Sequence, residues 1–180
     1  MPTGTGITAD TPLNLVVGAG VLLADHAFVG ATVDDNLFAV ERELFTPELN
    51  GIMWDLMGTD YINRSVPRLE ASVPEVGTGV IEKAIPGVSV DTSTPGMAVI
   101  EESGERRLDD ADYHAYELDI ERPNGGQFQF ELIRAINTGS FEGNLQDDGL
   151  FAPRWVLTGR GIASDPTDSP WKIRILDTAS

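Results

Sequence analysis

Apolar and polar side chains alternate with a period of two residues along much of this chain. That period is typical of β-strands that bury one face and expose the other. It covers residues 38–45, 68–73, 113–122, 127–136, 151–162 and 171–176. Residues 13–24 form an almost continuous apolar run with Gly18 and Gly20 inside it, which predicts either a buried strand or a strand pair with a bulge. With a further strand at 97–102, the patterns predict about eight to ten strands.

Turn residues separate these segments. Asp25-His26 and Asp34–Asn36 predict tight turns, because short polar side chains bond the local backbone and tolerate unusual dihedral angles. Pro123–Gly126, a Pro-Asn-Gly-Gly sequence, predicts a hairpin that joins 113–122 to 127–136. Residues 89–96 are rich in Ser, Thr, Pro and Gly, which indicates a connector.

One segment has helical spacing. The apolar residues that share one helical face there are Val80, Ile81, Ala84 and Ile85. Thr78 is the expected cap, and Pro86-Gly87 ends the helix. The pattern as a whole therefore predicts a mainly β protein, an antiparallel β-sandwich or barrel with one short helix and a long inter-strand loop. We assign residues 13–180 to this single β domain and residues 1–12 to a flexible N-terminal arm.

The long loop lies between strands 38–45 and 68–73 and has about twenty residues without a clear period. A loop of that length inside a compact domain usually has a function. It contains large apolar side chains that water does not favour, namely Ile52, Met53, Trp54, Leu56, Met57 and Tyr61. A partner subunit is one candidate for covering them.

The composition narrows the class of protein. The 180 residues suit one domain with its own hydrophobic core. The chain has no cysteine, which excludes a disulfide framework, a thiolate zinc site and a cysteine nucleophile. We expect no signal peptide, because the first residues have neither a basic start nor an apolar run. We also expect no membrane segment, because no apolar run approaches ~20 residues.

The net charge of −17 comes from 29 acidic residues against 12 Lys and Arg. A surface this acidic repels the phosphate backbone, so ordinary nucleic-acid binding is disfavoured. Three accounts of the acidity stay open. It can serve solubility, which charge alone favours; it can line a channel that DNA must pass through without sticking; or it can reflect a saline habitat.

No constellation of residues predicts catalysis, and we expect no catalytic residues, no metal and no cofactor. Gly18-Ala19-Gly20 lacks the third glycine and the following helix of a dinucleotide site. His26 and His114 are isolated, and no Gly-x-Ser-x-Gly elbow is present. The acidic turns at 109–112 and 165–168 lack the glycine and terminal glutamate of a calcium loop. Nothing selects a glycosidase-type carboxylate pair from the 29 acids.

The first half of the chain carries a series of segments that resembles a known family. These are VVGAGVLL (16–23), GATVDDNLFAVERELFTPELNG (30–51) and VPRLEASV (66–73). They look like the major tail tube proteins of long-tailed (siphovirus-type) bacteriophages, from Leu13 to about Val90. Beyond that, strand count and the Pro-Trp-Lys-Ile sequence at 170–173 are similar. The resemblance implies a flattened β-sandwich subunit of the phage tail tube type, which closes into rings, usually of six copies, that stack into a tube.

A structural virion protein is the function that the resemblance implies, with no enzymatic activity. The protein would be assembled in the host cytoplasm and would reside in the tail of the virion. Its partners would be further copies of itself, together with a tape measure protein and tail tip and terminator proteins. Viral DNA would pass through the negatively lined tube into the host without specific binding.

Two sets of site residues follow from this hypothesis. The predicted ring-stacking and subunit-interface residues are Trp54, Leu56, Met57, Arg42 and Arg68. Arg42 shares a predicted strand face with apolar residues and therefore needs a carboxylate, either in a neighbouring subunit or in an ordinary salt bridge. The candidate lumen-lining acids are Glu41, Glu43, Glu117, Asp119 and Glu121. Which strand face looks inward is open.

Two other functions also stay open. A carbohydrate-binding or hydrolytic β-sandwich protein would use Trp54, Trp155 and Trp171 with nearby acids as a sugar site. The inner tube protein of a contractile injection device would share the ring assembly but work inside a sheath.

Overall fold

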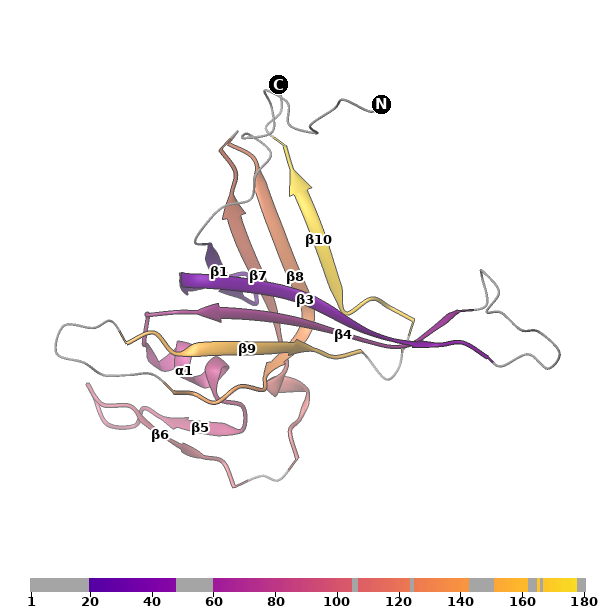
Figure 1. Cartoon of the computed structure of the whole chain (residues 1–180). Coiled ribbons are helices and arrows are strands. Elements are labelled where there is room, and N and C mark those ends of the chain that lie inside the picture. Colours follow the sequence, from indigo (N-terminus) through magenta and orange to yellow (C-terminus); the bar gives the residue numbers. More distant parts are fainter. Residues whose placement is uncertain are drawn as a thin grey trace.

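The computed structural model describes residues 20–47, 60–104, 107–123, 125–142, 151–161, 165 and 167–177. Within these residues the protein is mainly β, as the alternation predicts: a large antiparallel sheet of eight strands, a two-stranded sheet and one short α-helix (Figure 1). The strands are β1 (Val21–Ala24), β2 (Ala27–Ala31), β3 (Val33–Phe45), β4 (Tyr61–Ser72), β5 (Val88–Asp91), β6 (Val99–Glu102), β7 (His114–Glu121), β8 (Gln127–Asn137), β9 (Arg154–Gly159) and β10 (Trp171–Leu176). Helix α1 spans Thr78–Ala84, and a 3-10 turn spans Asp110–Asp112.

The large sheet has the strand order β2-β1-β7-β8-β9-β4-β3, with β10 as an additional neighbour of β8. β8 pairs with two strands in succession: residues 127–132 pair with β10, and residues 135–137 pair with β9. This division carries β9, β4 and β3 across the face of β7, β8 and β10 (Figure 1). The expectation of a barrel is wrong, because in the described part of the chain the sheet folds over without closing.

Thr32 is the corner of this arrangement. It alone separates β2 from β3, although the two strands lie at opposite ends of the sheet. The Thr32 amide donates to the Gly20 carbonyl at 2.7 Å, and its Oγ1 accepts from the Gly20 amide at 2.8 Å and from Asn36 Nδ2 at 2.9 Å. The predicted turn at Asp34–Asn36 is therefore wrong: these residues lie within β3, at an irregularity of its register between Val33 and Leu37.

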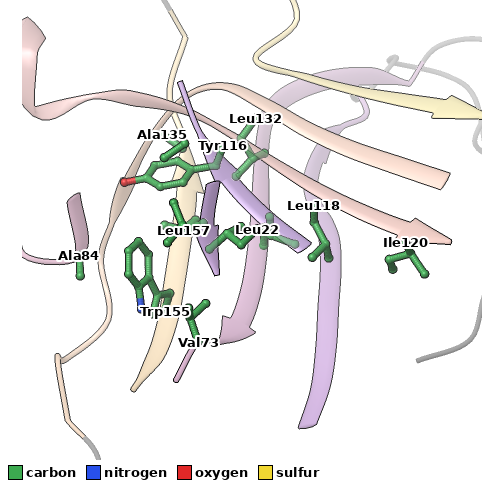
Figure 2. Packing of buried hydrophobic residues seen from close by; sticks show 13 residues of the cluster. Leu22, Val73, Ala84, Tyr116, Leu118, Ile120, Leu132, Ala135, Trp155 and Leu157 are labelled. Carbon is green, nitrogen blue, oxygen red and sulfur yellow. The ribbon is translucent and has the colours of Figure 1, made fainter. Parts of the chain in front are cut away.

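The hydrophobic core fills the space between the crossing strands. Trp155 and Tyr116 are its largest fully buried side chains, and their rings meet edge to face (Figure 2). Phe38 of β3 stacks on Phe130 of β8, with ring centroids 4.6 Å apart. Since β3 and β8 are not neighbours in the sheet, this contact joins the two layers face to face.

Helix α1 is confirmed, but its N-cap is Gly77 rather than Thr78, and no side chain caps it. Its C-terminal carbonyls are better satisfied, because side chains from the sheet reach them. Tyr116 Oη donates to the Lys83 carbonyl at 2.9 Å, and Asn137 Nδ2 donates to the Ala84 carbonyl at 2.6 Å. These two bonds attach the helix to β7 and β8.

The hairpin of β7 and β8 is confirmed, and a second, longer hairpin of β3 and β4 extends beyond the body of the protein (Figure 1). Its pairing reaches from Val33–Ser72 to Phe45–Tyr61. The predicted loop is therefore shorter than expected, since β4 begins at Tyr61 instead of near Arg68. Backbone pairing with β3, and not a side-chain period, forms the first half of β4. We call Glu41–Phe45 together with Tyr61–Ser65 the arm; this part of the hairpin is distinct from the predicted N-terminal arm of residues 1–12.

Candidate functional site

An acidic face covers the outer side of β7 and β8. Glu117, Asp119 and Glu121 alternate along β7 with core residues, so they point away from the core. Their cross-strand partners on β8 are Glu131, Gln129 and Gln127. The structure thus brings three of the predicted lumen-lining acids together on one surface and adds Glu131, which the sequence did not single out.

Gln129 and Arg174 organise this acidic face. Gln129 Nε2 donates to Glu117 Oε2 at 3.1 Å and to Asp119 Oδ1 at 2.8 Å. Arg174 of β10 donates to Gln129 Oε1 at 2.6 Å and forms an ion pair with Glu131 at 2.5 Å. Glu117 and Glu131 lie directly opposite each other, where like charges repel. The amide and the guanidinium offset that repulsion.

The acids of this face differ in exposure. Glu117 is only 6 % exposed, and its carboxylate also lies 2.6 Å from the imidazole Nδ1 of His26. Glu121 at the end of β7 is exposed, and Asp119 is half-buried. On this face, Asp119 and Glu121 are therefore the predicted acids that present negative charge to the outside.

Glu41 and Glu43 lie elsewhere. They are exposed on β3, where their partners on β4 are Val66 and Arg64. The two predicted acidic strand faces therefore belong to different layers, one on β3 and β4 and the other on β7 and β8. A single pore wall made from one layer contains one of these pairs of strands but not the other.

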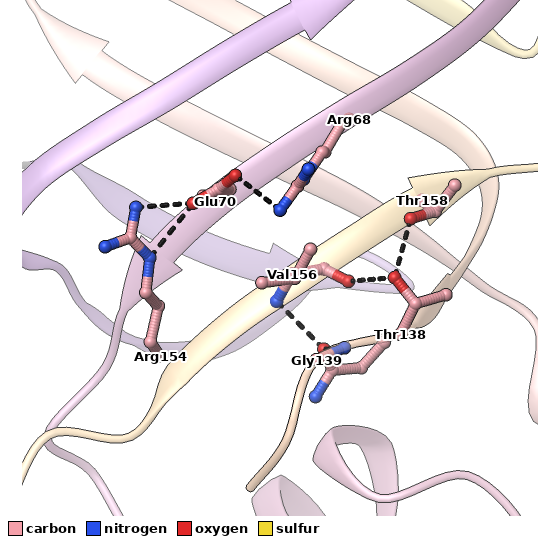
Figure 3. Close-up of polar contacts among 8 residues, drawn as sticks. Arg68, Glu70, Thr138, Gly139, Arg154, Val156 and Thr158 are labelled. Carbon is pink, nitrogen blue, oxygen red and sulfur yellow. Dashed lines mark hydrogen bonds and ion pairs between the residues drawn. The ribbon is translucent and has the colours of Figure 1, made fainter. Parts of the chain in front are cut away.

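Arg68 takes part in a buried ion-pair cluster within the chain (Figure 3). Glu70, 7 % exposed, receives Arg68 Nη2 on Oε1 at 2.8 Å and Arg154 Nε on Oε2 at 3.0 Å. Arg154 belongs to β9, next to β4 in the sheet. The sequence identified Arg68 but missed Glu70 and Arg154; their alternation with core residues was the only available signal, and it does not reveal a contact across 84 residues.

Arg42 has a different environment from Arg68. It is exposed on the arm, opposite Ser65, and forms no ion pair with any other residue that the structure describes. Within the described part of the chain, the salt bridge that was one of the two expected roles of Arg42 is therefore not present.

The arm exposes large apolar side chains. Leu44, Phe45, Tyr61 and Ile62 are 57–63 % exposed. They form the last two pairs of the β3–β4 hairpin, Leu44 with Ile62 and Phe45 with Tyr61. Trp54, Leu56 and Met57, the predicted stacking residues, lie outside the described residues. In the sequence, these three residues lie between β3 and β4, whose ends form the arm.

A second polar cluster joins the β1–β2 turn to α1 and β7. Asp25 and His26 both have positive φ, 52° and 63°, which fits the short turn between the two strands. Asp25 Oδ2 accepts from His114 Nδ1 at 2.8 Å and from Lys83 Nζ at 3.3 Å, and Oδ1 accepts from the Ala115 amide at 3.0 Å. Burial alone raises the pKa of Asp25, but these hydrogen bonds and charges hold it below its usual value.

His114 also lines an open cavity of about 390 Å³ between α1, β5 and the 109–112 turn. Lys83, Ser103 and Asp112 contribute to its wall. Asp112 bonds the backbone amides of Gly87 and Asp109 at 3.1 Å and 2.8 Å, and Asp25 bonds three neighbours. These carboxylates therefore hold loops and the helix in position, which is a structural role.

The described residues contain no group of three or more His, Asp or Glu side chains placed to hold a metal ion. Among the helices that the structure describes, none has the length and apolar character needed to cross a membrane. No model of a known protein family matches this chain, and no curated protein matches it either.

Proposed function

We propose that the protein is a structural subunit of a phage tail tube: copies form rings, hexameric by the resemblance, that stack into a conduit for genome delivery into the host. The subunit fold in this proposal is the flattened sandwich of the tail tube type. The proposal is supported by the resemblance of residues 13–90 and by a mainly β fold with a large antiparallel sheet.

The observation that carries the proposal is the arm. Four large apolar side chains exposed at the end of one hairpin are unfavourable in an isolated subunit, because each leaves apolar surface in water. Contact with another copy removes that surface. The arm and the adjoining residues that include Trp54, Leu56 and Met57 are accordingly the proposed contact between rings.

The negatively lined conduit requires a face that presents acids. The face of β7 and β8 offers Asp119 and Glu121, and the face of β3 offers Glu41 and Glu43. We favour β7 and β8, because Gln129 and Arg174 fix the orientation of its side chains. Like charge along the wall keeps DNA from binding to it.

The carbohydrate-binding or hydrolytic alternative receives less support. Trp155 is completely buried in the core, and Trp171 packs on Phe38 with ring centroids 5.9 Å apart. The Trp155 ring is therefore not free to stack on a sugar, and part of the Trp171 ring is covered by Phe38. The inner tube of a contractile device shares every feature used here, and a sheath protein encoded beside this chain would favour it.

The first experiment is negative-stain electron microscopy of the concentrated protein. We expect rings or hollow tubes of uniform bore. A protein that stays monomeric, both alone and in the presence of its tape measure and tail tip proteins, contradicts the proposal. A glycan array then tests the carbohydrate alternative.

A second experiment identifies the pore wall, using the absence of cysteine from the chain. Glu121→Cys introduces one thiol on the acidic face of β7 and β8, and Glu102→Cys introduces one at an exposed position on β6 as a control. In assembled tubes we expect the thiol at position 121 to react with a small maleimide but to be protected from a bulky polymer-linked maleimide. The thiol at position 102 should react with both, and equal reaction of the thiol at position 121 with the bulky reagent would contradict a lumen lined by β7 and β8.

A further inference from the structure

Three strands of the large sheet have an edge without a strand neighbour in the described part of the chain: β2, β3 and β10. An exposed edge presents unpaired amides and carbonyls to other chains. β2 is the shortest of these strands, and one amide of its edge is already bonded, since the Ala31 amide donates to Glu75 Oε1 at 3.1 Å. The edges of β3 and β10 remain.

β10 has one charged face and one apolar face. Lys172 and Arg174 share one face, and Ile173 and Ile175, 43 % and 59 % exposed, share the other. Arg174 is engaged by Glu131 and Gln129. Lys172 is exposed and forms no ion pair with the residues that the structure describes. In a chain with only 12 Lys and Arg, this strand edge is unusually basic.

The outer part of β3 has the opposite character. Glu41 and Glu43 share one face and are exposed, while Val40 and Arg42 lie on the other. Glu43 accepts a hydrogen bond from the neutral amide of Asn63 at 3.1 Å. Neither acid is paired with a cation among the described residues. β3 therefore offers an acidic edge that matches the basic edge of β10.

We propose that β10 of one copy pairs, edge to edge, with the outer part of β3 of the next copy. Lys172 then faces Glu41 and Glu43 across the new strand pair, and Ile173 and Ile175 continue the opposite face beside Val40. Because the two edges differ, the contact is head-to-tail, and it closes into a ring when the rotation between copies fits. The inference rests on the proposed self-assembly and names the strands that perform it.

Charged side chains on strand edges can also prevent pairing. The two roles predict different effects of reversing the charge of Lys172. If Lys172 only protects the edge, Lys172→Glu keeps a charge there and leaves association unchanged. If Lys172 pairs with β3 of another copy, Lys172→Glu places like charges opposite each other and weakens association.

Cross-linking tests the pairing directly. Glu43→Cys and Lys172→Cys proteins are mixed and treated with a short thiol-to-thiol cross-linker, one protein carrying a tag so that mixed dimers are recognised by mass. The control replaces Lys172→Cys by Glu102→Cys, an exposed position on β6. We expect mixed dimers on the order of tenfold above the control, because pairing raises the effective concentration of the thiols. A yield equal to the control overturns the inference.

Charge exchange provides the second test. Lys172→Glu and Glu43→Lys should each raise the protein concentration needed for assembly, and the double variant should return it toward the wild-type value. Thermal unfolding checks that each variant is folded. A double variant as defective as the single variants, or a Lys172→Glu protein that assembles more readily, overturns the pairing.

The outcomes separate this inference from the proposed function. Tubes from the wild-type protein with cross-linking at the control level keep the tail tube function and reject the β3–β10 pairing. Strong cross-linking without rings or tubes, also in the presence of the tape measure and tail tip proteins, keeps the pairing and rejects the tail tube.

Discussion

The body and the arm of this protein use the same kinds of side chain in opposite environments. Around Trp155, Tyr116 and Leu157 the apolar side chains are completely buried (Figure 2). On the arm, side chains of the same size are more than half exposed, although both regions belong to one sheet. The difference indicates that the body is stabilised by its own packing, whereas the arm holds its shape by backbone pairing and leaves its apolar surface exposed; in the proposed function this surface contacts another copy.

Charged residues repeat this contrast. Glu70 in the body is buried against Arg68 and Arg154, so its charge is satisfied within the chain (Figure 3). Glu41 and Arg42 on the arm are exposed and lack ion pairs among the described residues. Substitutions in the body should therefore change the free energy of unfolding, and substitutions on the arm should change assembly.

The largest effect on stability is expected for Trp155→Ala. Truncating a completely buried indole removes apolar contacts and leaves a cavity, at a cost of about 3–5 kcal/mol. Urea denaturation followed by fluorescence and circular dichroism measures it. A loss below ~1 kcal/mol would mean that neighbouring side chains repack into the space left by Trp155. The body would then owe less of its stability to close packing than its contrast with the arm implies.

Glu70→Gln is expected to cost less. It leaves Arg68 and Arg154 without their carboxylate, but their side chains are 40 % and 59 % exposed, so water replaces part of the interaction. We expect a loss of about 1–2 kcal/mol. Glu121→Gln, on an exposed carboxylate, is the matched control and should stay within ~0.5 kcal/mol. Equal losses for the two variants would contradict a stabilising role for the ion pairs of Glu70 with Arg68 and Arg154.

Tyr116→Phe removes the hydrogen bond to the Lys83 carbonyl and should cost about 1 kcal/mol. Burial, and to a smaller degree the charge of Asp25, raises the pKa of Tyr116 above its usual value of 10.0. Its contribution to stability is therefore complete below pH 10.0 and is lost as the pH rises toward the folded-state pKa. Ultraviolet titration should show this tyrosine ionising only with unfolding, and Tyr116→Phe should remove that phase.

Asp25→Asn tests the turn cluster through its dependence on pH. The pKa of Asp25 is lowered from 3.8 in the folded state. The ionised form therefore contributes stability above pH 3.8, and the contribution is lost as the pH falls through the lower folded-state pKa. We expect the variant to be less stable near neutral pH and to lose less stability on acidification, measured by thermal unfolding. Parallel pH profiles would contradict this.

Phe45→Ser should have the smallest effect on the subunit, within ~0.5 kcal/mol, because the side chain is already exposed. Its effect on assembly should be large, with few or no rings or tubes in electron microscopy. The expectation for Trp54→Ala is the same. If Phe45→Ser unfolds the subunit, the arm contributes to the core and the contrast with Trp155 fails.

Period-two alternation predicted much of the local structure. It identified the β7–β8 hairpin and the last strand, and helical spacing identified α1. It also placed Glu117, Asp119 and Glu121 on one face of a strand. These features are local, because alternation and turn chemistry act within a few residues.

Residue patterns along the chain were sufficient to predict the mainly β class, the helix and the acidity of the strand faces. The folded arrangement was needed to show that β8 pairs with both β10 and β9, that Thr32 forms a corner instead of leading into a turn, and that Glu70 meets Arg154. The physical reason is that pairing between strands distant in sequence depends on how a whole sheet bends and packs. Alternation indicates which face of a strand is buried, but it does not indicate which strand lies beside it.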